Sequence, residues 1–173
     1  MAIHRLNHAV LYVRDVDASV AFYGGVLGFT TQAAFPGAAF LRAPGSTNDH
    51  DLGLFQVGAD AVASPAGRGA VGLYHLAWEL ESLDDLEDHL HRLTEAGALA
   101  GMSDHGATKS LYGKDPDGLE FELVWLVPAH LLAGENLAED PRPKPLDLVK
   151  EKERYGGATR GGLGISIPLG VTV

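Results

Sequence analysis

The chain has 173 residues, 46% hydrophobic and 21% charged, a composition that fits one globular domain and excludes a disordered chain, a collagen or a coiled coil. A formal net charge of −10 argues against partners that present phosphates, so neither nucleic acid nor an anionic membrane surface is expected. Cysteine is absent, which excludes disulfides and thiolate sites, and with no recognisable signal peptide or membrane-spanning stretch we expect a cytoplasmic protein.

Residues 3–57 are predicted to form a strand, a helix and three further strands. The first strand is expected over residues 4–13, where apolar side chains alternate with others. A helix is predicted over residues 16–27, with Asp15 or Asp17 as its N-cap. Three short strands then follow, over residues 29–34, 38–42 and 51–57.

Residues 73–127 repeat this order of elements. A strand is predicted over residues 73–80 and a helix over residues 83–96. Ser82 and Asp85 have the spacing of a capping box at the start of that helix. Three strands complete the second half, over residues 99–102, 109–112 and 119–126.

The repeated βαβββ order predicts an α+β fold, in which two paired modules form one curled, mostly antiparallel sheet around a cavity. Residues 58–72 are rich in Gly and Pro and are interpreted as the linker between the modules, so residues 1–127 form a single domain. Residues 128–173 differ in character and are expected to be a C-terminal tail that packs on the domain or on a partner subunit. Open sheet edges favour a homo-oligomer, such as a homodimer.

Strand periodicity directs three possible metal ligands away from the faces that pack on helices. His8 and His75 lie on the first strand of each module, and Glu122 lies on the last strand of the second. On each strand the neighbouring positions are apolar, so the ligand-type residue points to the opposite face. If the sheet curls, the three side chains converge. Two imidazoles and one carboxylate suit Fe(II), with Mn(II) as a possible substitute, and leave positions open for substrate and oxygen.

Residues 103–122, SDHGATKSLYGKDPDGLEFE, resemble the ring-cleavage motif of extradiol catechol dioxygenases. The motif contains a His, a spacer, an aliphatic residue followed by Tyr, a D-P-x-G turn and a Glu. Its elements match His105, Leu111-Tyr112, the turn 115–118 and Glu122, while Ser103 replaces the Gly, Asn, Thr, Ile or Val that is usual there. Over residues 3–127 the chain resembles the vicinal-oxygen-chelate superfamily, which includes glyoxalases, bleomycin-binding proteins and fosfomycin-modifying enzymes.

The resemblance implies a role for six residues of this sequence. His8, His75 and Glu122 match the metal ligands, which makes the expected cavity a metal cavity. His50 matches an acid/base histidine, and His105 and Tyr112 match residues that contact substrate and oxygen. The implied activity is that of an extradiol dioxygenase, which uses non-haem Fe(II) and O2 to cleave a catechol ring next to its vicinal hydroxyls.

Three other functions remain open at this point. A glyoxalase usually has a further Glu ligand on the last strand of the first module, where only Gln56 could coordinate, so this function is disfavoured. A fosfomycin-type transferase uses the same ligand types but needs cations for a phosphonate, for which Lys109 and Lys114 are the nearby candidates. A non-catalytic drug-binding protein would fit the acidic charge but would not need the three ligands.

Overall fold

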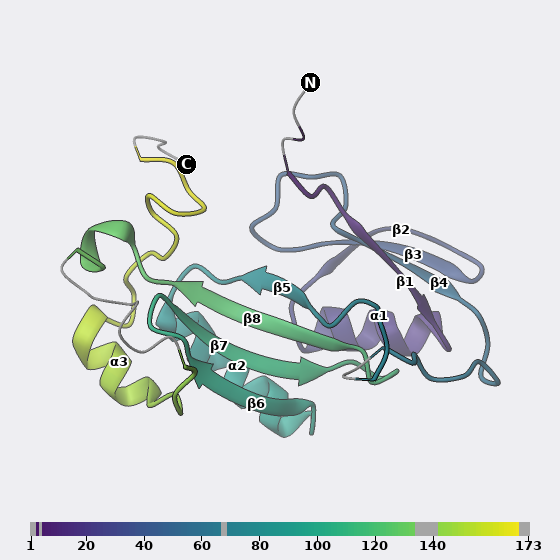
Figure 1. Cartoon of the computed structure of the whole chain (residues 1–173). Helices are drawn as coiled ribbons and strands as arrows, with labels where there is room; N and C mark the ends of the chain where they lie inside the picture. Colours follow the sequence, from purple (N-terminus) through teal and green to yellow (C-terminus); the bar gives the residue numbers. More distant parts are fainter. Residues whose placement is uncertain (1–2, 4, 67–68, 134–141, 170–173) are drawn as a thin grey trace. The chain divides into compact units, whose positions relative to one another are not determined.

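The computed structural model describes residues 3, 5–66, 69–133 and 142–169. The chain divides into two compact units, which are described separately (Figure 1). Unit 1 contains Met1–Ala70 and Asp115–Leu119, and unit 2 contains Val71–Lys114 and Glu120–Val173. None of the helices in the described ranges has the length and hydropathy needed to cross a bilayer.

Unit 1 contains one helix and a four-stranded sheet in the order β1-β4-β3-β2. The β1 and β4 strands are parallel, and the other neighbouring strands are antiparallel. The elements are β1 (Ala9–Val13), α1 (Val16–Gly25), β2 (Thr30–Phe35), β3 (Ala38–Arg42) and β4 (Leu52–Gln56).

The α1 helix begins where the sequence predicts it to begin. Of the two candidate caps, Asp15 takes the role, and its Oδ1 accepts a hydrogen bond from the Ala18 amide at 3.0 Å. The chain leaves the helix through Gly28, whose φ of +78° is a conformation that favours glycine. Leu11 and Val13 are buried on one face of β1. The alternate residues of the strand lie on the opposite face, which is the face that His8 would share if the alternation extended to it.

The Asp-Pro-Asp-Gly turn of the sequence motif is part of unit 1. Asp117 accepts hydrogen bonds from the Arg14 amide at 3.0 Å and from Arg14 Nη1 at 2.7 Å. Asp115 Oδ1 accepts the amides of Asp117 and Leu119, each at 2.9 Å, and Oδ2 accepts the Tyr23 hydroxyl at 3.2 Å. Burial raises the pKa of Asp115. The turn is thus anchored by one ion pair and one buried hydrogen bond.

Unit 2 contains a sheet of the same plan, in the order β5-β8-β7-β6, with β5 parallel to β8. In Figure 1 the α2 helix lies against one face of this sheet and α3 packs beside α2. The elements are β5 (Leu76–Glu79), α2 (Leu83–Glu95), β6 (Leu99–Asp104), β7 (Thr108–Lys114), β8 (Glu120–Leu126), the 3-10 helix η1 (Ala129–Leu131) and α3 (Leu148–Tyr155).

The α+β class and the repeated βαβββ order are confirmed. Within the described residues, backbone hydrogen bonds join the eight strands into two mixed four-stranded sheets, where one curled sheet was expected. The first strand of each unit is shorter than predicted because its partner strand covers only part of it. Ala9 pairs with Leu52 at the start of β4, and Leu76 pairs with Phe121 near the start of β8. His8 and His75 therefore each lie one residue before a strand.

The C-terminal segment packs on unit 2 through contacts that the sequence did not predict. Lys152 of α3 forms ion pairs with Asp84 at 2.7 Å and with Glu87 at 2.5 Å, both on α2. Farther along, the indole Nε1 of Trp125 donates to the Thr159 carbonyl at 3.1 Å. The boundary between a domain of residues 1–127 and a tail of residues 128–173 stays a prediction.

Tyr23→Phe is expected to lower the free energy of unfolding by about 1–3 kcal/mol, because the buried Asp115 carboxylate loses a hydrogen-bond donor. Tyr12→Phe is the matched control, since the Tyr12 side chain belongs to a residue that is 75% exposed. Removal of that hydroxyl is expected to change stability by less than about 0.5 kcal/mol. Urea denaturation of the two variants measures the difference, and equal effects would contradict the role of the Tyr23–Asp115 bond.

Candidate active site

Glu122 is the centre of a polar cluster in unit 2. In the sheet, β8 pairs Glu122 with Ala77 of β5 on one side and with Tyr112 of β7 on the other. Its Oε2 lies 3.1 Å from Nε2 of His75, and its Oε1 accepts a hydrogen bond from the Tyr112 hydroxyl at 3.2 Å. Each oxygen of the carboxylate therefore has its own partner.

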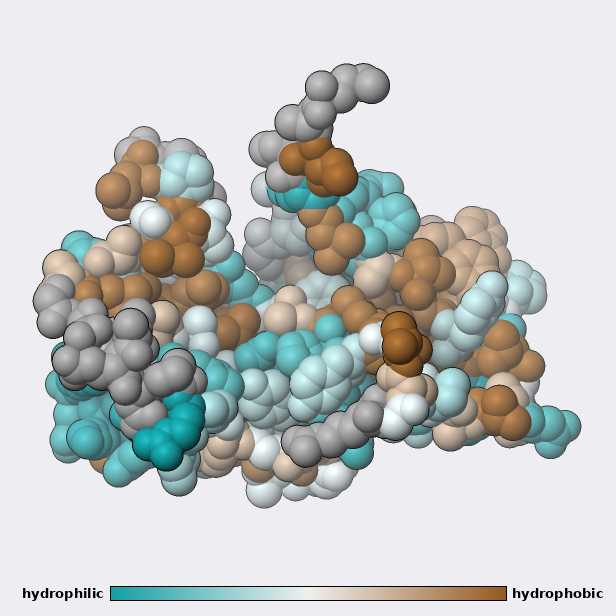
Figure 2. Space-filling model, viewed as in Figure 1, coloured by the Kyte–Doolittle hydropathy of each residue, from teal (hydrophilic) through white to brown (hydrophobic). Residues whose placement is uncertain are grey.

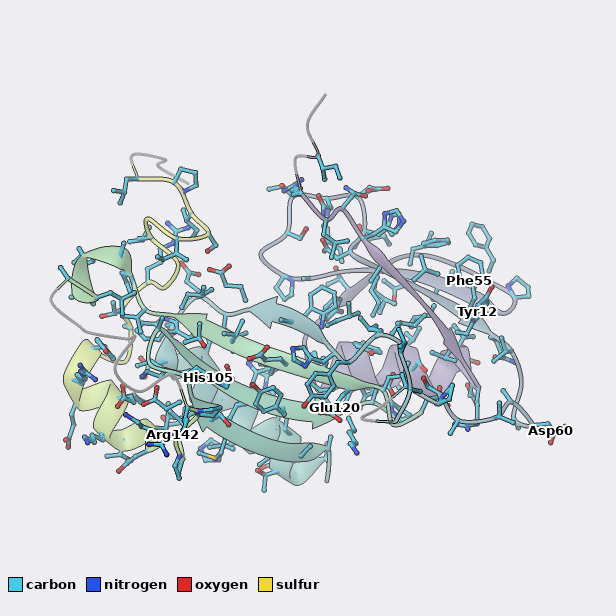
Figure 3. All side chains as sticks on the ribbon, in the orientation of Figure 1. Tyr12, Phe55, Asp60, His105, Glu120 and Arg142 are labelled. Atoms are coloured by element: carbon cyan, nitrogen blue, oxygen red, sulfur yellow. The ribbon has the colours of Figure 1, made fainter. Side chains whose placement is uncertain are left out.

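His105 extends this cluster from the turn between β6 and β7, where Figure 3 labels it. Its Nε2 lies 2.9 Å from the Tyr112 hydroxyl oxygen. A phenol has one proton, and here that proton is donated to Glu122, so the His105 Nε2–H donates to the phenol oxygen. The three side chains form a chain of hydrogen bonds from imidazole to phenol to carboxylate.

Tyr112 is a hydrogen-bond donor rather than an acid in this cluster. Burial and the negative charge of Glu122 raise the pKa of the Tyr112 phenol to about 12. The phenol therefore keeps its proton throughout the neutral range. A neutral phenol can hydrogen-bond an anionic oxygen of a ligand without adding a second negative charge beside Glu122.

A pair of histidines lies in unit 1. The ring centroids of His8 and His50 are 4.6 Å apart, and the Phe40 ring meets His50 edge-on at 5.1 Å. His8 Nδ1 lies 2.8 Å from the side-chain oxygen of Asn7, and His50 Nδ1 lies 2.9 Å from Asp49 Oδ2. Both partner atoms are acceptors, so Nδ1–H donates in each ring and each Nε2 keeps its lone pair.

Asp49 and His50 form a carboxylate–imidazole pair. The hydrogen bond from His50 lowers the pKa of the Asp49 carboxyl, which therefore stays ionised near neutral pH. An ionised carboxylate at Nδ1–H fixes the tautomer of the imidazole and leaves the lone pair on Nε2.

The sheet face of unit 1 that continues from His8 is apolar and exposed. Val10 and Tyr12 of β1 are 52% and 75% exposed, and Phe55 of β4 is 37% exposed. Tyr12 and Phe55 are register partners on neighbouring strands and lie side by side in Figure 3. Hydrophobic residues are exposed on other parts of both units as well (Figure 2). This face could hold the apolar part of a ligand.

The structure brings four of the six predicted site residues together in unit 2, namely His75, His105, Tyr112 and Glu122. The other two, His8 and His50, are neighbours in unit 1. Within the described residues of either unit, no three His, Asp or Glu side chains are arranged to hold a metal ion. The convergence of His8 with His75 and Glu122 stays a prediction.

Asn7 and Asp49, which bond the two unit 1 histidines, were not predicted as site residues. Each directly precedes its histidine in the sequence, and this adjacency was the available signal. Adjacent residues on a regular strand point to opposite faces, so the sequence gives no reason to expect the contact. The contact forms because both residue pairs lie just before their strands, where this alternation does not apply.

Lys109 is not the surface cation that a phosphonate-binding site would need. Its side chain is completely buried on the helix-facing side of β7. The ammonium lies 2.5 Å from Asp104 Oδ1 and 2.9 Å from Glu151 Oε2. Because both carboxylates already neutralise it, Lys109 is unavailable to an anionic ligand, and of the two expected cations Lys114 alone is exposed.

Residues 5–123 match the family model of the Glyoxalase/Bleomycin resistance protein/Dioxygenase superfamily. The chain is 34% identical over 118 residues to a catechol-2,3-dioxygenase of Bacillus subtilis (strain 168), a match that covers 68% of this chain and 40% of the relative. It is 35% identical over 127 residues to biphenyl-2,3-diol 1,2-dioxygenase 3 of Rhodococcus globerulus, which covers 69% of this chain and 62% of the relative. The chain thus spans less than two thirds of either dioxygenase.

A solved structure has the same fold. The glyoxylase/bleomycin resistance protein/dioxygenase domain from Frankia sp. EAN1pec superimposes with a TM-score of 0.57 at 24% sequence identity. The match covers 71% of this chain and 98% of that domain. At this identity the likeness shows the fold alone.

In the metal-free protein, Glu122→Gln is expected to lower the Tyr112 pKa below about 12, because the substitution removes the negative charge beside the phenol while burial, the larger cause of the shift, remains. Titration of the phenolate ultraviolet absorbance measures this pKa, and the difference from Tyr112→Phe identifies the signal. Glu120→Gln makes the same change two residues earlier on β8 and is expected to leave the titration unchanged. Equal titrations of the two Glu variants would contradict the Tyr112–Glu122 contact.

Proposed function

Because the chain belongs to the Glyoxalase/Bleomycin resistance protein/Dioxygenase superfamily, we propose that it is an extradiol dioxygenase that cleaves a catechol with Fe(II) and O2. The main support is the Glu122 carboxylate, because one of its oxygens lies beside His75 Nε2 and the other accepts the Tyr112 hydroxyl. These residues and His105 form a single cluster in unit 2. The dioxygenase names of the relatives support the same function.

The His75–Glu122 pair fits a metal ion. Two neighbouring ligand atoms on an octahedral ion with bonds of about 2.1 Å lie about 3.0 Å apart. His75 Nε2 and Glu122 Oε2 are 3.1 Å apart, and both side chains are only partly exposed. An imidazole nitrogen and a carboxylate oxygen suit Fe(II), and Mn(II) accepts similar donors. His75 and Glu122 would hold the metal, with His8 as the third ligand.

The contact with Asn7 gives His8 the tautomer that a third ligand needs. Its Nδ1–H is engaged with Asn7, so the lone pair that remains is on Nε2. Fe(II), when bound, supplies the electron transfer that lets a catechol react with dioxygen. Within this proposal the side chains of the chain itself bind and orient the substrate and move its protons.

His50 and Tyr112 act on the oxygens of the substrate in this proposal. A catechol must lose a proton to chelate a metal as an anion, and the Asp49–His50 pair accepts that proton at His50 Nε2. Tyr112 keeps its own proton, and its hydroxyl, which donates to Glu122 in the protein without substrate, donates instead to a substrate oxygen. His105 donates its Nε2–H to the phenol oxygen and so orients the Tyr112 hydroxyl, and in this proposal it also hydrogen-bonds near the substrate or oxygen.

Two contacts disfavour the alternative enzymes. Gln56, the candidate fourth ligand of a glyoxalase, accepts the Val16 amide through its side-chain oxygen at 3.1 Å, so that oxygen is already used at the start of α1. A fosfomycin-type transferase loses one of its two candidate cations, because Lys109 is buried between carboxylates. Neither contact affects the dioxygenase proposal.

With Fe(II) loaded anaerobically, the protein is expected to take up oxygen with members of a catechol panel and to form a yellow ring-fission product. Glu122→Ala and His75→Ala are expected to reduce iron affinity and oxygen uptake by roughly 100-fold. His91→Ala is the matched control because His91 is an exposed residue of α2, and its activity is expected to equal that of the unmodified chain.

Iron content, measured on the same samples, separates the possible failures. Iron-loaded protein that consumes no oxygen with any catechol would contradict the dioxygenase function and favour a transferase or a binding protein. Protein that binds neither Fe(II) nor Mn(II) would contradict the ligand assignment and favour non-catalytic drug binding. Equal activity of Glu122→Ala and His91→Ala would remove Glu122 from the site.

A further inference from the structure

The C-terminal segment, residues 142–169, is bound to the turn that carries His105. This segment lies outside the residues that match the family model. The amide and carbonyl of Lys144 exchange two hydrogen bonds of 2.8 Å with the carbonyl and amide of Asp104. Asp104 is the last residue of β6, and His105 follows it directly. The backbone before His105 is therefore paired with the C-terminal segment.

A buried ion cluster makes a second connection at the same place. Lys109 Nζ lies 2.5 Å from Asp104 Oδ1 and 2.9 Å from Glu151 Oε2 of α3. The Tyr155 ring, also on α3, lies 5.6 Å from the same ammonium. Lys109 is completely buried and Glu151 is 4% exposed, so solvent screens the Lys109–Glu151 pair little.

The Asp104 side chain connects the ion cluster to the backbone of the turn. The oxygen that meets Lys109 also accepts the Gly106 amide at 2.7 Å, and the His105 amide donates to the Thr108 carbonyl at 2.9 Å. His105 itself is exposed, so packing of its own ring does not fix its position. Its place beside Tyr112 depends instead on the conformation of residues 104–108.

We propose that the buried Lys109–Glu151 ion pair is a positioning device for His105, which acts by holding the Asp104 carboxylate under the turn. The C-terminal segment then contributes to the geometry of the site through Glu151. The effect of this ion pair on catalysis rests on the proposed function. Its effect on the geometry of His105 is independent of that function.

The choice of a lysine at position 109 supports this assignment. Burial of a charge is unfavourable, and well-packed apolar residues in place of a buried ion pair are often equally or more stable. An apolar side chain at this position would also pack against α3. It could not, however, contact Asp104 Oδ1 as the ammonium does, so hydrophobic packing could not fix the position of the Asp104 carboxylate.

The test compares two double variants that each remove an ion pair between α3 and the rest of unit 2. Lys109→Met with Glu151→Met removes the buried pair that reaches Asp104 and leaves no unpaired lysine. Lys152→Met with Glu87→Gln removes the partly exposed ion pairs of Lys152 with α2 and does not contact Asp104. Far-ultraviolet circular dichroism and thermal unfolding check that both variants fold.

Hydrogen exchange and imidazole NMR of the metal-free protein measure the turn directly. In the Lys109/Glu151 variant the Gly106 amide is expected to exchange at least roughly tenfold faster, and the His105 imidazole nitrogen shifts move toward those of a solvated histidine. The Lys152/Glu87 variant is expected to match the unmodified chain in both signals. Unchanged signals in the Lys109/Glu151 variant, or equal changes in both variants, would overturn the proposal.

Kinetics with an active catechol adds a separate readout. Loss of positioning is expected to lower kcat by roughly tenfold in the Lys109/Glu151 variant, as outer partners of a site commonly do. The Lys152/Glu87 variant is expected to keep the kcat of the unmodified chain. If the unmodified chain consumes no catechol, the proposed function fails while the exchange and NMR results still decide the positioning role.

Discussion

The site depends on the two-residue period of β8. Phe121, Leu123 and Trp125 are buried on the face that packs on the helices, which forces Glu122 onto the opposite face. A shift of one residue would bury the carboxylate and expose the core, so the hydrophobic packing of unit 2 fixes the orientation of Glu122. His75 and Tyr112 reach its two oxygens because β5, which begins directly after His75, and β7, which contains Tyr112, are the neighbours of β8 on either side.

Local patterns were sufficient to predict most of the elements and the faces of the strands. The sequence predicted both helices of the repeat and their caps at Asp15 and Ser82. It also predicted that Glu122 lies on the face opposite its apolar neighbours. Each of these features depends only on residues a few positions apart. The starts of β1 and β5 were predicted too early. A strand lasts only as long as its partner, and the positions of the partners' first residues, Leu52 and Glu120, are set by the fold.

The role of the C-terminal segment was not predictable from the sequence, because it depends on contacts between residues far apart in the chain. Lys109 has the sequence context of a surface lysine on a short strand, and Glu151 has that of a residue on a charged helix. Their burial follows only when α3 packs beside α2. The candidate site was therefore predictable where strand periodicity places a side chain, and unpredictable where tertiary packing supports it.

The two units use equivalent sheet positions differently. Each histidine precedes the first residue of a first strand, and the second residue of that strand pairs with Gly53 in unit 1 and with Glu122 in unit 2. Gly53 is thus the counterpart of the carboxylate. A Cβ there would make ordinary van der Waals contacts with Val10 and Phe40, which lie 3.4 Å and 3.6 Å from its place. At this position unit 1 therefore has an apolar neighbourhood beside His8 and no carboxylate, and of the two equivalent positions only the one in unit 2 carries a carboxylate.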